Sequence, residues 1–260
     1  MTDMIVRAAE EWLGIKTNPD DAKRLETYIL DTYGAVSEKT INIVFASGEA
    51  ADFLTVNETY FFREPAHFTF LLDFLRLYKG SSLRVLSAAT ATGCEAYSVA
   101  MLIEAHNRSA EPVSYHIDAF DINPRVIETA CQGIYPLRSL REDGSCFRYM
   151  ADPYLKKKDD KYAIAPSLKE NINFFEHNFM NALPAGEYDF IFFRNAFIYI
   201  CERHRDHVLS NLSAGLKEGG YLIMGVSETA AARHADLEAK NINDVFFFQK
   251  QSIYSRQNVI

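Results

Sequence analysis

Apolar residues along the chain fall into short continuous runs that alternate with longer stripes at helical spacing. The runs at 83–86 and 188–193 have the length and character of strands buried on both faces, and further strands are predicted at 115–121, 221–225 and 245–249. The amphipathic stretch 202–216, closed by Glu218, Gly219 and Gly220, is typical of a helix between two strands. This alternation predicts an α/β fold with a doubly wound, mostly parallel sheet covered on both faces.

The first 56 residues lack such runs and are predicted to form a small helical N-terminal domain. Ala22, Leu25 and Ile29 recur at three- and four-residue steps, and Asn18–Asp20 supplies a helix start signal. Residues 1–56 contain ten acidic and five basic side chains, so their exposed surface is expected to be negative. Residues 57–260 are then expected to form the main domain.

Residues 134–176 interrupt the alternation of strands and helices. Two short stretches, 162–165 and 171–175, predict an antiparallel hairpin, and hence a small β-subdomain inserted at about 134–176. The charged run Lys156–Lys161 is interpreted as a solvated loop tip, with a contact surface as the alternative.

Composition excludes several classes of protein. The chain is 48% hydrophobic and 24% charged, which suits a globular core, and its net charge of −8 argues against nucleic-acid binding. No run approaches about 18 uncharged apolar residues, and the charged N-terminus lacks the apolar core of a signal peptide. We therefore expect a cytoplasmic protein without membrane insertion, and nothing in the pattern requires more than a monomer.

The cysteines give no sign of a disulfide framework or a metal site. Cys94, Cys131, Cys146 and Cys201 lie far apart and form no C-x-x-C pair, so reduced thiols are expected. Cys201 and His204 lack a second pair of ligands, so no metal is predicted there.

The stretch Leu83–Ile103 reads as a buried strand, a loop of small residues and a helix. Such a loop lets backbone N–H groups approach a nucleotide-like ligand. Its one glycine, Gly93, matches neither G-x-G-x-x-G nor a Walker A sequence, so a well-packed turn without a ligand is the alternative. Asp121 ends the next strand, where an acid binds ribose hydroxyls or else caps the following helix.

The aromatic stretch Asn57–Phe68 contains one arginine, Arg63, directly behind two phenylalanines. Pro65 suits the first turn of a helix. Arg63 is either a surface charge with a packed stem or a guanidinium held beside a carboxylate.

Five sets of residues together resemble the CheR-type chemotaxis receptor methyltransferases, which use S-adenosylmethionine. They are N-E-T-x-F-F-R at 57–63, S-A-A-x-x-T-G-x-E-x-Y-S at 87–98, F-D-I-N at 120–123 with G-I-Y at 133–135, R-N-x-x-I-Y at 194–199 and G-G-Y-L-x-x-G-x-S-E at 219–228. The resemblance implies a class I, Rossmann-like methyltransferase domain with a helical N-terminal domain and an inserted antiparallel β-subdomain.

The resemblance also implies a site for S-adenosylmethionine and its product S-adenosylhomocysteine. The expected cofactor-binding residues are Asn57, Thr59, Arg63, Ala89, Gly93, Glu95, Asp121, Asn178, Phe179, Asn195 and Ala196. By the same matching, Asn57, Thr59 and Arg63 approach the methionine end and Glu95 its amino group. Asp121 takes the ribose hydroxyls, and Asn178 and Phe179 flank the adenine.

Arg63 and Tyr199 are the expected catalytic residues. Arg63 would orient a substrate glutamate through charge-assisted hydrogen bonds, and Tyr199 would lie near the transferring methyl group. A glutamate with a pKa of about 4.3 is ionised at neutral pH and needs no general base. The resemblance therefore implies a protein-glutamate O-methyltransferase, and its catalysis should be mainly positioning and exclusion of water.

Three departures from the family pattern, Cys94, Ala96 and Cys201, motivate a different function. The alternative is a weak or inactive regulatory module that only binds S-adenosylmethionine or S-adenosylhomocysteine. A nicotinamide-dependent oxidoreductase is a third hypothesis, which lacks the glycine fingerprint.

The resemblance implies that the substrate is a chemoreceptor cytoplasmic domain or another signalling protein. A receptor tail could dock by adding a strand to the β-subdomain. The acidic N-terminal segment differs from the basic helix of receptor methylators. The resemblance therefore supports binding of the cofactor more strongly than recognition of a receptor.

Overall fold

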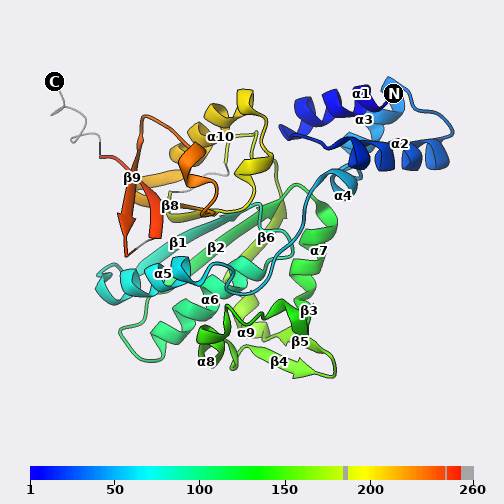
Figure 1. Ribbon diagram of the computed structural model, residues 1–260. Coiled ribbons are helices and arrows are strands. Elements are labelled where there is room, and N and C mark those ends of the chain that lie inside the picture. The colour runs from blue at the N-terminus through cyan, green and yellow to red at the C-terminus, as the bar shows by residue number, and fades with distance from the viewer. Residues whose placement is uncertain (184–186, 244, 253–260) are drawn as a thin grey trace, which may run out of the picture.

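The computed structural model describes residues 1–183, 187–243 and 245–252 and is built on a seven-stranded sheet (Figure 1). The strand order is β6-β2-β1-β7-β8-β10-β9, and the first five strands are parallel. The strands are β1 Ser82–Ala88, β2 Ser114–Asp121, β6 Ile172–Glu176, β7 Tyr188–Phe193, β8 Leu216–Met224, β9 Leu237–Ile242 and β10 Val245–Lys250. The predicted mostly parallel α/β sheet is confirmed; residues 253–260 of the predicted main domain lie outside the described part.

The two faces of the sheet are covered by different helices. Along β7, Phe190 and Phe192 join a core with α5 (Pro65–Leu77) and α6 (Cys94–Asn107), whereas Ile191 and Phe193 join the opposite core with α10 (Glu202–Gly215). Successive strand residues point to opposite faces, so a continuous apolar run is required when both are covered. The helix α7 (Pro124–Gln132) follows β2 and begins the connection to β6, which also contains the inserted region.

The N-terminal helices pack on the α10 side of the sheet. They are α1 Thr2–Ala8, the π-helical turn η1 Ala9–Leu13, α2 Pro19–Tyr33, α3 Glu38–Ala46 and α4 Ala51–Leu54. The predicted helix start is confirmed, because Asn18 Oδ1 accepts hydrogen bonds from the backbone N–H groups of Asp20 and Asp21 at 2.8 and 2.9 Å. Leu25 and Ile29 belong to the same buried cluster as Phe193 on the sheet. The domain boundary at residue 56 stays a prediction.

A small antiparallel sheet, β3-β5-β4, occupies the inserted region. Its strands are β3 Ile134–Pro136, β4 Leu155–Lys158 and β5 Lys161–Ile164, and the short helices around it are η2 Leu137–Ser139, η3 Ser145–Phe147, α8 Arg148–Ala151 and α9 Pro166–Lys169. The predicted pairing of 162–165 with 171–175 is wrong. The second stretch forms β6, which runs parallel to β2 with Ile172 opposite Ile117, because apolar character marks a strand but does not specify its partner.

The charged run 156–161 also differs from its interpretation as a loop tip. Lys156–Lys158 lie in β4 and Lys161 begins β5, with Asp159 in the turn between them at φ 54°. β4 is an edge strand with exposed lysines, and a strand of this kind shows no apolar run. The edge strand β9, whose side chains are mostly exposed, shows no continuous apolar run either and is not predicted from the sequence.

The start of β8 was placed too late in the sequence. The strand begins at Leu216, directly after α10, and its pairing with β7 is irregular between Tyr188 and Phe190. Two further short helices, η4 Phe197–Tyr199 and η5 Thr229–Ala231, follow β7 and β8. Among the described residues, no helix is both long and apolar enough to cross a membrane.

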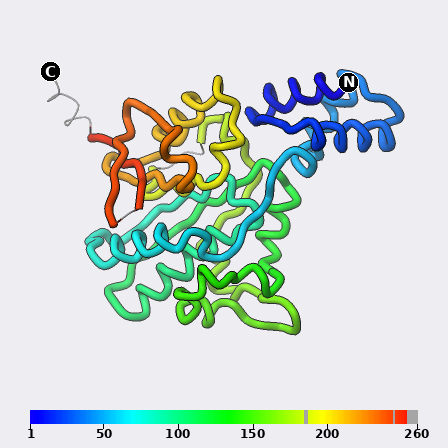
Figure 2. The backbone as a smooth tube through the Cα atoms, in the orientation of Figure 1, coloured from blue at the N-terminus to red at the C-terminus, as the bar shows by residue number. Residues whose placement is uncertain are grey.

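The order of the strands creates a crevice at one edge of the sheet. β1 pairs with β2 on one side and with β7 on the other. Later strands of the chain are therefore added to the sheet on both sides of β1. Loops that leave the carboxyl ends of such strands diverge and leave room for a ligand. Figure 2 shows residues 55–64 leaving the N-terminal helices and descending to α5.

Candidate active site

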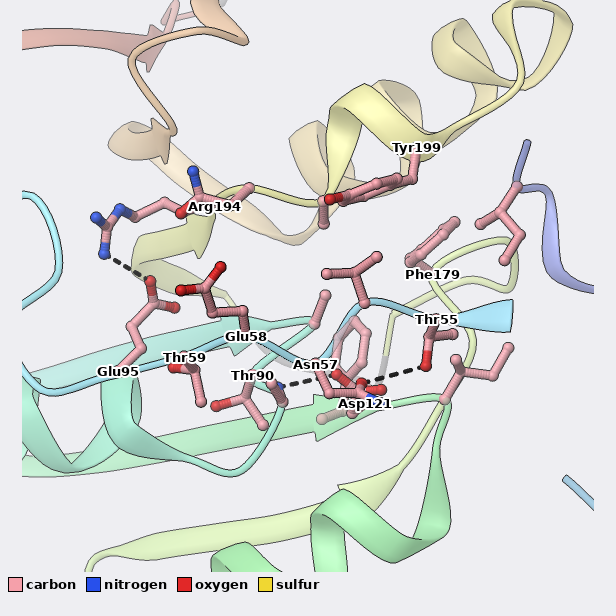
Figure 3. Close-up of a pocket in the computed structure, with 18 of the residues that line it drawn as sticks. Thr55, Asn57, Glu58, Thr59, Thr90, Glu95, Asp121, Phe179, Arg194 and Tyr199 are labelled. Carbon is pink, nitrogen blue, oxygen red and sulfur yellow. Dashed lines mark hydrogen bonds and ion pairs between the residues drawn. The ribbon is translucent and has the colours of Figure 1, made fainter. Parts of the chain in front are cut away.

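A cavity lies where the loops after β1, β2 and β7 meet residues 54–63. Its empty volume is about 920 Å³, part of which opens to solvent. Figure 3 shows Glu95 and Arg194 at one end of this cavity and Phe179 toward the other, with Tyr199 across from Asn57.

Most of the predicted site residues meet in this cavity. The lining includes Asn57, Thr59, Arg63, Ala89, Glu95, Asp121, Phe179, Asn195, Ala196 and Tyr199. They come from five separate parts of the sequence, so the fold alone brings them together.

Gly93 and Asn178 lie outside the residues that line the cavity. Gly93 has φ 83°, and a Cβ there would lie 2.9 Å from both Ala130 Cβ and Phe174 Cε1, so the backbone and the packing both require glycine. The Asn178 side chain donates to Trp12 O at 2.8 Å and accepts from Met180 N at 2.9 Å. Their predicted cofactor contacts stay predictions.

Left-handed backbone conformations gather around the cavity. Phe62, Glu64, Ala89, Ala91 and Asn195 all have φ between 49° and 58°. Non-glycine residues pay about 1–3 kcal/mol each for such strain, and strain of this kind clusters at ligand sites where surrounding contacts hold it. The geometry of these loops is therefore maintained by tertiary contacts.

Asp121 holds the loop after β1. Its two carboxylate oxygens accept one backbone N–H each, from Ala91 at 2.9 Å and from Asn123 at 3.0 Å. Burial raises the pKa of this carboxyl, and the backbone N–H groups act in the opposite direction. The capping alternative is not supported, because the residue that caps α7 is Asn123, whose side chain accepts from Arg125 N at 2.9 Å.

A buried charge network forms one end of the cavity. Arg194, whose side chain is 2% exposed, lies 3.0 Å from Glu95 and 3.4 Å from Glu64. It also donates to the Arg63 carbonyl, and its guanidinium stacks over the Phe68 ring at 5.5 Å. The positive charge of Arg194 is thus neutralised within the protein.

The pKa values of the two carboxyls in this network are shifted in opposite directions. Burial raises the pKa of Glu95, although Arg194 and the Ser87 hydroxyl, which donates at 2.7 Å, favour its ionised form. Burial also opposes ionisation of Glu64, but the charge of Arg194 and the Asn195 amide lower its pKa. In the described structure both carboxyls are engaged by protein groups.

His67 packs beneath Glu64 and is buried. Its Nδ1 lies 3.3 Å from Glu64 Oε2 without forming a hydrogen bond. Burial, followed by the charge of Arg194, lowers the pKa of His67 to about 4. His67 is therefore neutral at physiological pH.

Glu228 is a structural residue of the site that sequence reasoning missed. Its carboxylate is fully buried and accepts from the backbone N–H groups of Asn195 at 2.7 Å, Gly225 at 2.8 Å and Ile198 at 3.2 Å. Its only sequence signal was its place at the end of G-G-Y-L-x-x-G-x-S-E. Glu64 and Arg194 were also missed, and Arg194 begins R-N-x-x-I-Y.

The departures from the family pattern do not form the lining of the cavity. Cys94, Ala96 and Cys201 are buried and none of them lines it. Burial raises the pKa of the Cys94 thiol to about 12, so this thiol is unreactive. All four cysteines are free, and no three His, Cys, Asp or Glu side chains in the described part of the chain are grouped to hold a metal ion.

The family model of the CheR methyltransferase, SAM binding domain, matches residues 57–245. The chain belongs to this family. It is similar to "Chemotaxis protein methyltransferase" of Borreliella burgdorferi, at 34% identity over 70% of this chain and 67% of that protein. It is also similar to "Probable biofilm formation methyltransferase WspC" of Pseudomonas aeruginosa, at 33% identity over 76% of this chain and 48% of that protein, about half its length.

Among solved structures, the chain resembles the N-methyltransferase NodS from Bradyrhizobium japonicum in complex with S-adenosyl-L-homocysteine. The identity is 15%, the match covers 72% of this chain and 87% of that chain, and the TM-score is 0.40.

This CheR-family chain is a methyltransferase that uses S-adenosylmethionine, and the cavity fits that cofactor. Phe120, Ile122 and Phe179 offer apolar surface suited to an adenine ring, whereas Thr59 and Glu95 offer polar groups. Each oxygen of Asp121 accepts one backbone N–H, and a carboxylate oxygen has capacity for a further donor such as a ribose hydroxyl. The matched family leaves no support for the nicotinamide alternative.

Proposed function

We propose that this protein is a protein-glutamate O-methyltransferase that acts on chemoreceptors or a related signalling protein. The observation that carries the proposal is the unequal state of the two cations that line the cavity. Arg194 is neutralised by Glu64 and Glu95. Arg63 forms no ion pair with any described residue.

The surroundings of Arg63 leave its charge available to a carboxylate. Its Nη1 donates to the Glu58 carbonyl at 2.9 Å, and its guanidinium lies 5.6 Å from the centre of the Tyr60 ring. The guanidinium has five N–H donors in a planar fork that matches a carboxylate. We therefore expect Arg63 to bind an acidic side chain of the substrate, which would be the methyl acceptor.

The reaction needs little from the protein beyond placement. S-adenosylmethionine, when bound, supplies an electrophilic methyl group on a sulfonium. A glutamate oxygen oriented by Arg63 forms the new O–CH₃ bond as the S–CH₃ bond breaks, and the electron pair of that bond stays on sulfur. No proton moves, because glutamate with a pKa of about 4.3 is already ionised. Tyr199 would fix the reacting groups through its hydroxyl, and the bound reactants would exclude water from the cavity.

Label transfer tests the proposed reaction. Receptor-containing membranes incubated with the protein and methyl-labelled S-adenosylmethionine should become labelled, and alkali should release the label as methanol. Label that resists alkali would show N-methylation, and the glutamate assignment would be wrong. Stoichiometric cofactor binding with no transfer to any receptor would favour the regulatory module.

Replacing Arg63 tests its role. Arg63→Ala is expected to reduce methyl transfer at least about 100-fold, because misplacement of the acceptor costs rates of this order. Arg76→Ala, at a surface arginine paired with Asp73 on α5, is the matched control and should behave like the wild type. Calorimetry with S-adenosylhomocysteine separates an effect on the cofactor from one on the substrate. Unchanged transfer and unchanged cofactor affinity in Arg63→Ala would contradict the assignment.

Docking of a receptor tail on the inserted sheet is part of the same proposal. β4 lies at the edge of the β3-β5-β4 sheet, where an extended peptide can add as a further strand. NMR titration with receptor-tail peptides should shift the signals of Lys156–Lys158, and shifts confined to other regions would remove this suggestion.

A further inference from the structure

The segment Leu13–Lys16, which joins η1 to α2, reaches the cavity from outside the matched family domain. Leu13 and Ile15 line the cavity and are only 5% and 7% exposed. Both also belong to the core shared by the N-terminal helices and the sheet. A stretch of the N-terminal helical unit therefore forms part of the cavity wall.

Residues 14–16 of this segment pair through their backbone with residues 199–201. The Lys16 N–H donates to the Tyr199 carbonyl at 2.7 Å, and the Cys201 N–H donates to the Gly14 carbonyl at 2.9 Å. Ile15 and Ile200 form an isolated antiparallel bridge. One backbone hydrogen bond thus connects the N-terminal unit to Tyr199, the residue expected to lie beside the transferring methyl group, and a second connects it to Cys201, two residues later.

The path of the segment is closely specified. Gly14 has φ 70°, and a Cβ at this position would lie 2.5 Å from Met180 Sδ. The carbonyl of Trp12, the residue before the segment, accepts a hydrogen bond from the Asn178 side chain at 2.8 Å. Asn178 and Gly14 therefore serve the course of this segment, a role that the sequence did not reveal for either residue.

Residues 195–201, which contain Tyr199 and are called the Tyr199 loop, are held by hydrogen bonds at both ends. Glu228 binds the Asn195 and Ile198 N–H groups at its beginning, and residues 14–16 bind its end. Without the second set, the backbone on the C-terminal side of Tyr199 loses both of these hydrogen bonds.

We propose that Leu13–Lys16 forms part of the methyltransferase site and is required for its activity. Its backbone positions Tyr199, and its two apolar side chains close the wall of the cavity. The proposal rests on the proposed function for the role of Tyr199, whereas the cofactor-binding part of it stands separately. Gly14 and Lys16 are positioning residues, because they act through the Tyr199 loop.

Replacing Lys16 with proline removes the backbone N–H that donates a hydrogen bond to the Tyr199 carbonyl. Proline favours an extended residue before it, and Ile15 is already in an extended bridge, so the change suits the local backbone. Lys16→Ala retains the N–H and removes the exposed ion pair with Glu202. The effect of Lys16→Pro beyond that of Lys16→Ala therefore measures the backbone contact.

The expected result is a loss of both turnover and cofactor affinity. Methyl transfer by Lys16→Pro should fall at least about tenfold below that of Lys16→Ala, because the Tyr199 ring is no longer placed. Affinity for S-adenosylhomocysteine should fall severalfold, mostly through loss of the wall. Equal turnover and equal affinity in the two variants, both folded by circular dichroism, would overturn the proposal.

Hydrogen exchange on the unaltered protein gives a second test. Saturating S-adenosylhomocysteine should slow amide exchange in peptides that cover residues 13–16 and 199–201 together. Slowing around Asp121 without slowing at 13–16 would contradict the proposal even if the proline variant did not fold. If the wild type binds the cofactor product but methylates no receptor, the proposed function fails while this exchange result still decides the role of the segment.

Discussion

The carboxylates around the cavity are mostly bound by the protein itself. Glu64 and Glu95 pair with Arg194, and Glu228 binds three backbone N–H groups. Buried charges require such partners because leaving one unpaired costs several kcal/mol. Arg63 is the exception among the lining cations, and this imbalance favours an anionic substrate group over a cationic one.

His67 gives the protein a defined sensitivity to acid. Its pKa is lowered to about 4 in the folded state, whereas an unfolded histidine titrates near about 6.5. Above pH 6.5 both states are neutral and the full stability is present. As the pH falls toward 4 only the unfolded state gains the proton, so stability is lost over this window, by up to about 3 kcal/mol.

Denaturant unfolding as a function of pH measures this effect. His67→Asn should flatten the fall in unfolding free energy between pH 6.5 and 4, whereas His106→Asn, at a partly exposed position, should retain the wild-type slope. Glu64 and Arg194 face His67 in the fold, so their charges remain in both proteins. An identical pH slope in wild type and His67→Asn would show that the buried histidine does not carry the dependence.

At the scale of elements, helix ends determine how the cavity wall is built. Both η1 and α2 end at a glycine in the left-handed region, Gly14 at φ 70° and Gly34 at φ 76°. The two positions have the same backbone requirement but different surroundings, since a Cβ at Gly34 would meet nothing within 4 Å. Only Gly14 is crowded, against Met180.

This pair of glycines provides a matched experiment. Gly14→Ala and Gly34→Ala should each lose about 1 kcal/mol of stability from the left-handed conformation. Only Gly14→Ala should also weaken S-adenosylhomocysteine binding, because its methyl group displaces Met180 and shifts the segment that lines the cavity. Calorimetric titration of both variants checks this. Equal affinities would mean that the segment tolerates displacement.

At the scale of the whole molecule, the N-terminal helices and the sheet are stabilised by one continuous core. Ile5 and Leu25 from the helices belong to the same buried cluster as Phe120 and Phe193 from the strands. Neither part could expose its share of this apolar surface without cost, since burial contributes roughly 25 cal/mol per Å². We therefore expect the two parts to unfold together.

Two spectroscopic probes can test this cooperativity. Trp12, the single tryptophan, reports on the N-terminal unit through its fluorescence, and far-ultraviolet circular dichroism reports on all helices and strands. Their thermal transitions should coincide, and S-adenosylhomocysteine at about 100 times its Kd should stabilise both by about 2.7 kcal/mol. An earlier Trp12 transition would support a domain boundary near residue 56.

Much of the fold could be predicted from the local pattern of apolar residues. Most of the wrong or missing strand predictions concern strands at the edges of the two sheets. β1 and β7 carry apolar residues on both faces because both faces of these strands are covered, so their apolar runs predict strands correctly. β4 and β9 are edge strands with polar positions, and β6 carried no information about its partner. For the site, the stretches that follow strands identified most of the lining, because loop residues at strand ends converge in any sheet of this order.

The sequence by itself determined most strands of the main sheet, the strand-loop-helix unit at 83–103 and the family, because each depends on residues that are close together in the chain. Only the tertiary structure decided which groups remain available for chemistry. The neutralisation of Arg194 by Glu64 and Glu95, the anchoring of Asn195 by Glu228 and the pairing of residues 14–16 with 199–201 join positions that are distant in sequence. No local pattern encodes such contacts, since they arise when separate elements pack against each other.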